Sequence, residues 1–228
     1  MVEPNGLAID GNDNLYVASC GPCGHGLSGS ASIEEFAAGS NGNATPIRMI
    51  AGPLTQLDGP GGGPGGGPGG IALDTSGNIY VAATDEIAVF GPQQSGNVAP
   101  LRLISGPHTR LNAPYGIAVD ARYIDVGSYT SPAFVLRFAL DANGDKRPRG
   151  TISGGATQIN SYLGGLAVTA EGELIGDDRG SQAGSPPPPQ ILKFRGRANG
   201  NVAPRSVLAG STTQLAIPLF LTLAPSRG

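Results

Sequence analysis

The side chains best suited to redox or metal chemistry lie near the N-terminus, where Cys20, Cys23 and His25 occur in one short stretch. The Cys-x-x-Cys spacing is that of redox-active dithiols, in which a helix N-terminus lowers the pKa of the first thiol. Residues 24–29 are rich in glycine and disfavour such a helix. A local disulfide between Cys20 and Cys23, or an inert reduced pair, is therefore the favoured interpretation. The three side chains are also zinc ligands by type, but a structural zinc site needs four ligands, with Asp85 as the candidate for the fourth.

A second group of chemically capable residues is charged. Asp177, Asp178 and Arg179 are consecutive, and His108 is one of two histidines. Paired carboxylates and a histidine on one surface could coordinate a divalent cation or act as general acid and base. Asp177 and Asp178 are therefore candidate metal ligands. Charged residues are also ordinary on protein surfaces, so a solvated loop is the favoured interpretation, and no cofactor is predicted beyond a divalent cation as the alternative.

Three further motifs resemble functional signatures but fit structural roles better. Residues 59–70 have glycines at phosphate-loop spacings but lack the Lys-Ser/Thr pair of a P-loop, which favours a low-complexity connection. The prolines at 186–189 predict a stiff polyproline loop. Residues 141–145 begin like a calcium loop, but Ile152 stands where the closing glutamate is needed, so a turn is the better interpretation.

These residues all belong to a cassette of about fifty residues that occurs four times, and periods of this length indicate repeat folds. Each copy opens with a Gly-apolar-Ala-apolar run, at 6–9, 70–73, 116–119 and 165–168. A second short apolar run and an apolar-x-x-Phe signature follow. Each copy then has a Gly-Asn/Asp-x-x-Pro turn, which begins at Gly42, Gly96, Gly144 and Gly200.

The four runs of each cassette are short, rich in β-branched and aromatic residues, and bounded by Gly, Pro, Asn and Asp. This pattern predicts antiparallel strands. A four-stranded sheet cannot bury both of its faces alone, so successive sheets must pack face to face around an axis. We therefore predict an all-β protein, a β-propeller with one four-stranded antiparallel blade per cassette. The alanine of each first run suits an innermost strand, where the blades crowd the axis.

The cassette resembles the NHL-repeat class of propellers, whose units carry a Gly-Ile-Ala-Val-Asp, x-x-Gly-Asn, Ile-Tyr-Val-Ala pattern. Residues 70–82 match this pattern almost letter for letter, and the resemblance covers nearly the whole chain. Copy four departs from it at Thr169, Glu173 and Gly176, and copy three has a shortened first turn at residues 121–122. The resemblance implies a bacterial protein located outside the cytoplasm, in a superfamily that includes sugar lactonases dependent on one divalent cation.

The whole chain, residues 1–228, is predicted to form a single NHL-like propeller domain. Its blades are expected at approximately 4–52, 68–106, 114–154 and 163–210. Residues 218–225 align with the first strand of a fifth blade. Propellers have about four to eight blades, and the resembled class commonly has six. An incomplete arc of a six-bladed propeller is the favoured interpretation, and a closed four-bladed ring with a spare strand is the alternative. An open arc would need additional blades or a second copy of the chain to close.

Antiparallel strands place the loop between the second and third strands of each blade on the same face as the connections between blades. Nearly all the variation between copies lies in these segments, whereas the turns on the other face are repetitive. Because function favours variable loops on a rigid scaffold, we expect any binding site on this variable-loop face, near the axis. The candidate residues are His25, Asp85, Glu86, His108, Tyr129, Asp177, Asp178 and Arg179.

Residues that recur in every copy are expected to serve the scaffold instead. An aspartate ends the first run in three copies, where its carboxylate can accept N–H bonds from the following turn. A threonine recurs in each connection between blades, and we expect it to be a turn element. These positions are Asp10, Asp74 and Asp120, and Thr55, Thr109, Thr157 and Thr213.

Composition narrows the function classes. The net charge of −3 gives no basic footprint for nucleic acid, and six Tyr, six Phe and no Trp make stacking platforms scarce. No apolar run is long enough to span a bilayer, and no signal peptide is visible before the first strand. The sequence favours a non-enzymatic scaffold that binds a protein, peptide or glycan. The alternative is a divalent-metal-dependent propeller enzyme resembling sugar lactonases or streptogramin-cleaving lyases.

Overall fold

In a computed structural model of the protein, the described residues are 3–21, 31–58, 67–180, 188–215 and 221. They form sixteen short strands and three 3-10 turns. The strands are β1 (Pro4–Ile9), β2 (Leu15–Ser19), β3 (Ser32–Phe36), β4 (Arg48–Ala51), β5 (Ile71–Leu73), β6 (Ile79–Ala83), β7 (Glu86–Phe90), β8 (Arg102–Ser105), β9 (Pro114–Val119), β10 (Tyr123–Ser128), β11 (Val135–Ala139), β12 (Gly150–Ile152), β13 (Leu163–Val168), β14 (Leu174–Asp178), β15 (Gln190–Phe194) and β16 (Ser206–Ala209). The 3-10 turns are η1 (Pro53–Thr55), η2 (Gly155–Thr157) and η3 (Ser211–Thr213).

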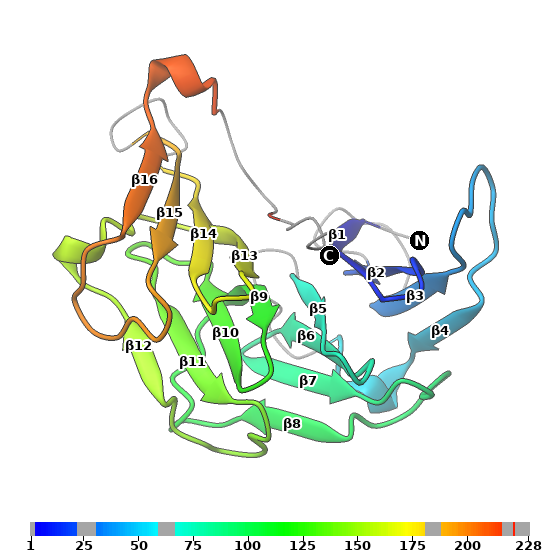
Figure 1. The fold of residues 1–228 in the computed structure, drawn as a ribbon. Helices are drawn as coiled ribbons and strands as arrows, with labels where there is room; N and C mark the ends of the chain where they lie inside the picture. The colour runs from blue at the N-terminus through cyan, green and yellow to red at the C-terminus, as the bar shows by residue number, and fades with distance from the viewer. Residues whose placement is uncertain (1–2, 22–30, 59–66, 181–187, 216–220, 222–228) are drawn as a thin grey trace.

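Each cassette forms one four-stranded antiparallel sheet, with its strands hydrogen-bonded in chain order from β1-β2-β3-β4 to β13-β14-β15-β16. The four sheets are arranged around a central axis, with the first strand of each innermost and the fourth outermost (Figure 1). This arrangement confirms the predicted all-β fold with four-stranded blades. None of the described residues belongs to a helix with the length and hydrophobicity needed to span a membrane.

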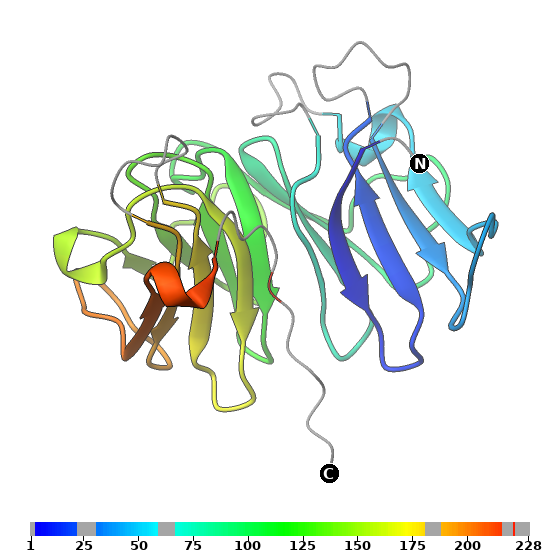
Figure 2. The same cartoon turned by 90° about the horizontal axis from the view of Figure 1, so that it is seen from above.

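The first and fourth blades lie on either side of an opening in the ring (Figures 1 and 2). Inner strands pack in succession, β1 beside β5, β5 beside β9 and β9 beside β13. Within the described part of the chain, no comparable strand packing joins the first blade to the fourth. The predicted fifth strand at 218–225 lies outside the described residues, except for Leu221. The six-blade count for the complete protein therefore stays a prediction.

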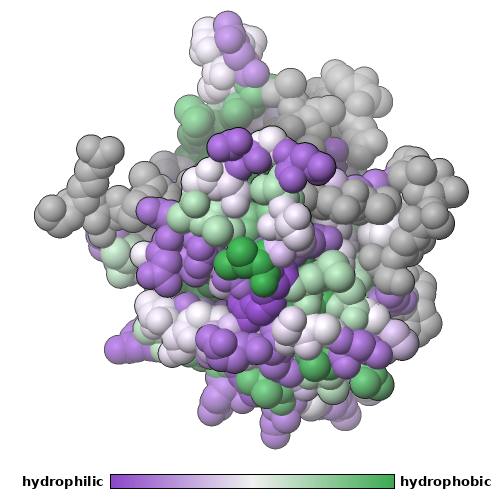
Figure 3. Space-filling view, turned by 90° about the vertical axis from the view of Figure 1, so that its right-hand side faces the viewer, coloured by the Kyte–Doolittle hydropathy of each residue, from purple (hydrophilic) through white to green (hydrophobic). Residues whose placement is uncertain are grey.

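The outer surface is mixed in polarity. Seen from the side of the first blade, apolar patches are small and separated by polar residues (Figure 3). Isolated apolar side chains of this kind are ordinary on a soluble surface. The large apolar residues that are exposed include Leu7 and Ile9 of β1 and Val207 and Leu208 of β16. These four residues lie on the two blades that flank the opening.

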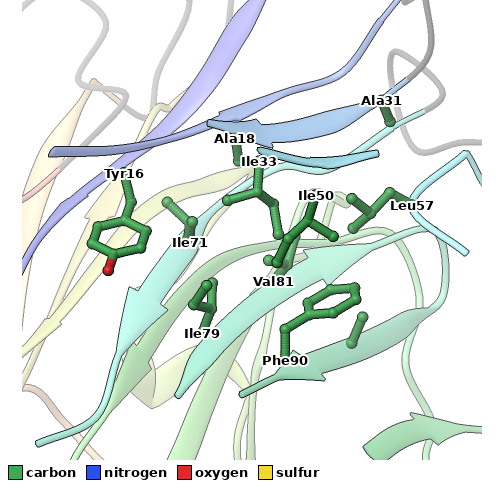
Figure 4. Packing of buried hydrophobic residues seen from close by; sticks show 11 residues of the cluster. Tyr16, Ala18, Ala31, Ile33, Ile50, Leu57, Ile71, Ile79, Val81 and Phe90 are labelled. Atoms are coloured by element: carbon green, nitrogen blue, oxygen red, sulfur yellow. The ribbon is translucent and has the colours of Figure 1, made fainter. Parts of the chain in front are cut away.

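In the described part of the chain the hydrophobic core forms three layers, one between each pair of successive blades. Between the first two blades, Ile33 and Ile50 meet Ile79, Val81 and Phe90 (Figure 4). These side chains are at most 2% exposed. Burial of apolar surface stabilises by about 25 cal/mol per Å², so the free energy that joins the blades comes mainly from these layers.

A repeated hydrogen bond adds specificity to each junction between blades. Each blade ends at a glycine, and in every blade but the last the backbone N–H two residues after this glycine donates a hydrogen bond to the next blade. The acceptor is the side-chain Oδ1 of the Asn or Asp in that next blade's Gly-Asn/Asp-x-x-Pro turn. We call this contact the Asn clasp. The clasps join Leu54 N to Asn97, His108 N to Asp145 and Ala156 N to Asn201, at 2.8, 2.7 and 2.7 Å. The turn that receives each clasp is closed by its threonine, whose hydroxyl donates to the carbonyl of that glycine.

The turns on the repetitive face depend on the recurrent aspartates. Asp10 Oδ1 accepts the N–H groups of Asn12 and Asn14, at 2.8 and 2.9 Å. Asp74 and Asp120 accept equivalent backbone bonds in the next two blades. The predictions that these aspartates and the recurrent threonines are turn elements are confirmed.

Candidate functional site

Three tyrosines and an arginine meet between the third and fourth blades on the variable-loop face. Tyr115 lies in β9, Tyr129 follows β10, Tyr162 precedes β13 and Arg179 follows β14. The ring centroids of Tyr115 and Tyr129 are 5.0 Å apart, and those of Tyr129 and Tyr162 are 4.8 Å apart. The guanidinium carbon of Arg179 lies 5.2 Å from the centroid of Tyr129, and Arg179 donates to the Tyr129 hydroxyl. We call these four residues the tyrosine–arginine cluster.

The backbone holds this cluster from both blades. Tyr129 N–H donates to the Ala113 carbonyl at 2.7 Å, and Tyr162 N–H donates to the Thr130 carbonyl at 2.9 Å. Gly69 of the second blade leaves room for Tyr115, because a Cβ at Gly69 would lie 2.8 Å from the tyrosine ring. The scaffold therefore fixes the backbone of Tyr129 and Tyr162, and Tyr115 packs closely against Gly69.

A buried carboxylate lies beside the cluster. Asp177 is fully buried in β14, and its Oδ1 accepts the N–H groups of Gly164 and Gly165 at 2.7 and 2.8 Å. Its Oδ2 has no hydrogen-bond partner among the described residues. Burial raises the pKa of Asp177 to about 7, and the neighbouring Asp178 charge adds to the shift. Burial also raises the pKa of Tyr115, which interacts electrostatically with both Asp177 and Arg179.

Arg179 has an unsatisfied hydrogen-bond donor, which complements the unsatisfied acceptor of Asp177. Its Nε is buried and has no partner in the part of the chain that the structure describes. Burial lowers the pKa of the Arg179 guanidinium. One unsatisfied acceptor, on Asp177, and one unsatisfied donor, on Arg179, therefore accompany the three tyrosines. Such groups are costly unless a ligand or water satisfies them.

The neighbouring Asp178 has a structural role. Its Oδ1 accepts the N–H groups of Ser161 and Gly180, and its Oδ2 accepts Asn160 N–H and Gln190 Nε2. The solvated-loop interpretation of Asp177 and Asp178 is wrong, because both side chains are fully buried in β14. The physical reason is the supply of backbone N–H donors around them, which offsets part of the cost of burying the two carboxyl groups.

In the second blade, Glu86 is a further carboxyl with an unsatisfied oxygen. Its Oε1 is buried and lacks a partner among the described residues. Burial and the nearby Asp85 raise the pKa of Glu86 to about 7. Asp85 itself is exposed, and its Oδ1 accepts Ala113 N–H at 2.9 Å, which ties the second blade to the third.

The structure places His108 away from these groups, in the Asn clasp between the second and third blades. His108 Nδ1 lies 2.5 Å from Asp145 Oδ2. This pair reinforces one clasp only, since the other two use asparagine. Cys20 is buried and disulfide-bonded. Cys23 and His25 lie outside the described residues.

Comparisons with solved structures support the architecture. No family model and no curated protein matches the sequence. A protein of unknown function from Bacteroides caccae is similar, with a TM-score of 0.61, 15% identity, and coverage of 96% of this chain and 70% of that one. A chain in the Mitotic Checkpoint Complex has a TM-score of 0.56 and 13% identity, with coverage of 90% and 50%. The chain is a four-bladed β-propeller.

This propeller spans half the length of the checkpoint-complex chain that it matches. At these identities the likeness shows the fold alone. Among the described residues of the propeller, no group of three or more His, Cys, Asp and Glu side chains is placed to hold a metal ion. The divalent-cation site at Asp177 and Asp178 stays a prediction.

Sequence reasoning identified part of the propeller's candidate site. Tyr129, Asp177 and Arg179 were candidates, and the structure brings them to one place. Tyr115 and Tyr162 were missed, although Tyr115 stands where the second and fourth copies have Gly69 and Gly164. Such a departure from the repeat is the signal that could have found it.

The raised pKa of Asp177 predicts a pH-dependent stability for the propeller. Because the folded carboxyl has a pKa of about 7 instead of 3.8, the native state holds a proton that the unfolded state releases. Stability should therefore fall as the pH rises from about 4 to about 7. The Asp177→Asn variant should lose the part of this dependence that Asp177 contributes and keep the part due to Glu86, whose pKa is also raised to about 7. Urea midpoints at a series of pH values measure the difference.

The matched control for this prediction is Asp145→Asn. The His108 side chain holds the pKa of Asp145 below its ordinary value. The contribution of Asp145 to stability is therefore lost as the pH falls through its folded pKa, the opposite sign to Asp177. An Asp177→Asn profile that follows the parent chain between pH 4 and 7 would contradict the assignment.

Proposed function

We propose that this propeller is a non-enzymatic scaffold that binds a peptide segment of another protein on its variable-loop face, at the tyrosine–arginine cluster. The observation that carries the proposal is the placement of three tyrosines in contact and a partly unsatisfied arginine beside the buried, unsatisfied acceptor of Asp177. Tyrosine and arginine are among the residues most enriched where binding energy concentrates in protein interfaces. A peptide backbone that enters between the rings and reaches these two buried atoms would supply the donor that Asp177 Oδ2 lacks and the acceptor that Arg179 Nε lacks.

The repeat supports the same conclusion. Scaffold positions recur between copies, whereas Tyr115, Tyr129 and Arg179 occupy positions that differ from one blade to the next. One solved structure of similar fold belongs to the Mitotic Checkpoint Complex, so propellers of this shape serve in at least one protein assembly. The NHL-repeat resemblance, with the bacterial origin and extracytoplasmic location that it implies, is part of this proposal and rests on residues 70–82.

Selection from a displayed peptide library, followed by affinity measurement, tests the proposal. The Arg179→Ala variant should bind the selected peptides at least about tenfold more weakly, because a central arginine anchor is lost. The control is Arg122→Ala, an exposed arginine on the repetitive face, which should bind like the parent chain. Equal affinity of the Arg179→Ala variant would exclude the cluster as the binding site, and binding confined to a glycan array would replace the peptide by a sugar.

A metal-dependent lactonase-like or lyase-like activity is the second candidate. The observation in its favour is Asp177, a buried carboxyl with a pKa of about 7, as suits a general acid or base. Elemental analysis of the purified protein distinguishes the two candidates. A stoichiometric divalent ion that is lost in the Asp177→Asn variant would support the enzyme and contradict the pure scaffold.

A further inference from the structure

The two ends of the blade array carry the two halves of one contact. Among the described residues, three Asn clasps join the four blades, and one acceptor turn and one receiving turn take part in none of them. The acceptor turn is Asn41-Gly42-Asn43 of the first blade, which is exposed. The receiving turn follows Gly210 at the end of the fourth blade.

The junction between the third and fourth blades shows what the complete contact requires. Asn199 Oδ1 accepts Thr151 N–H at 2.8 Å, and Gly200 N–H donates to the Thr151 carbonyl at 2.6 Å. Asn201 Oδ1 then accepts Ala156 N–H at 2.7 Å. The same tripeptide, Asn-Gly-Asn, stands at 41–43. The first blade therefore presents the full donor and acceptor set of a working junction.

The receiving turn on the fourth blade is preformed. Gly154, which receives a clasp, has φ 110° and ψ 165°, and Gly210 has the same two angles. A Cβ on Gly154 would lie 2.6 Å from Asn201, whereas none of the described residues comes within 4 Å of the equivalent point on Gly210. The turn after Gly210 therefore already has the backbone conformation of a turn that receives a clasp.

Apolar side chains that are buried at the three closed junctions are exposed on both sides of the opening. Leu208 of β16 is 55% exposed, whereas its counterparts Ile50, Ile104 and Ile152 are at most 2% exposed because the next blade covers them. At the other end, Leu7 of β1 is 62% exposed, although its counterparts in the other three blades are 5 to 6% exposed. Both flanks of the opening therefore have the apolar surface of a blade junction.

We propose that the opening between the fourth and first blades is a docking site for further propeller blades of this same cassette, whose leading blade carries a Gly-Asn or Asn-Gly-Asn turn. That turn binds the outer edge of β16 and the turn after Gly210, and the docked sheet covers Leu208. The last of the docked blades lies beside the first blade of this chain. Its Gly-x-x-Thr turn donates an N–H to the Asn43 side chain, and its sheet covers Leu7. A second copy of the chain is not the occupant, because the opening takes up less of the circle than four blades do (Figure 1).

The test extends the full chain at its C-terminus by a second copy of residues 3–106, which supplies two blades and an Asn-Gly-Asn turn. Amide exchange at Val207, Ala209 and Thr212 should slow at least about tenfold, because these N–H groups gain partners. The melting temperature should rise by at least about 5 °C as Leu7 and Leu208 are covered. The matched control carries Asn41→Ala and Asn43→Ala in the appended copy, and should lose most of the added protection.

Three outcomes would overturn the proposal. Exchange at β16 that is unchanged by the extension shows that the edge does not accept a blade. The second is rapid amide exchange throughout the appended blades while the first four blades remain folded, which also shows that β16 does not accept a blade. Stable self-association of the unextended chain, with β16 protected in the oligomer, would replace the proposed occupant by a second copy.

Discussion

Replacing Arg137 by methionine is expected to lower the free energy of unfolding by about 3–5 kcal/mol, because it strands a buried carboxylate. Arg137 of β11 donates to Asp125 of β10 through Nε at 2.7 Å and through a terminal nitrogen at 3.0 Å. The two side chains are only 9% and 4% exposed. Burial raises the pKa of Asp125 even with Arg137 in place. The melting temperature should fall by roughly 6–20 °C for a chain of this size.

The loss in the Arg137→Met variant should depend on pH. Without the guanidinium, the pKa of folded Asp125 rises further above its unfolded value, so the native state holds a proton that the unfolded state releases. The deficit relative to the parent chain should therefore grow as the pH increases from about 4 to about 8. Chemical denaturation at both ends of this range measures it.

Two variants control this prediction. Adding Asp125→Asn to Arg137→Met removes the stranded charge and should recover part of the loss. Arg102→Met is the comparison within the repeat, since Arg102 donates to backbone carbonyls and to the Tyr80 hydroxyl and leaves no buried carboxylate behind. An equal loss in Arg102→Met would show that ordinary packing, and not the buried charge, sets the cost.

The same pair illustrates what a repeat alignment can and cannot predict. In the first two blades a tyrosine occupies this position, Tyr16 or Tyr80, and an arginine of the fourth strand reaches it. In the third blade the tyrosine becomes Asp125, the fourth strand has Gly150, and Arg137 comes from the third strand instead. The alignment of the copies correctly predicts the three strands that carry these residues, β10, β11 and β12. The exchange of partner strand is a matter of cross-strand register, which spacing alone does not show.

Some features of the candidate site could be predicted from the repeat alignment, and others could not. Copy-to-copy variation pointed to Tyr129 and Arg179, which the structure brings into contact, because residues that differ between copies are not required by the scaffold. The burial of Asp177 was not predictable from its type, since it depends on N–H donors from Gly164 and Gly165 across the sheet. His108 was a candidate on the same reasoning, yet its ring is used by the clasp to Asp145.

A single added methyl group is expected to have a large effect at Gly70, the first residue of the second cassette's opening run. Gly70 N–H donates to the Tyr115 carbonyl of the next blade at 2.8 Å. A Cβ on Gly70 would lie 2.5 Å from that same carbonyl oxygen, and a backbone atom cannot move aside without shifting β9. Overpacking of this kind costs about 1–3 kcal/mol. The Gly70→Ala variant should therefore show a clearly lower urea midpoint.

The control is Gly155→Ala in η2, where an added Cβ meets nothing within 4 Å and stability should change by no more than about 0.5 kcal/mol. Equal stability of the two variants would show that the inner strands can separate without cost. Since β9 carries Tyr115, a shift of this strand also moves one ring of the tyrosine–arginine cluster. Gly70→Ala should accordingly weaken binding of the selected peptides even under conditions in which the variant is fully folded, whereas Gly155→Ala should not.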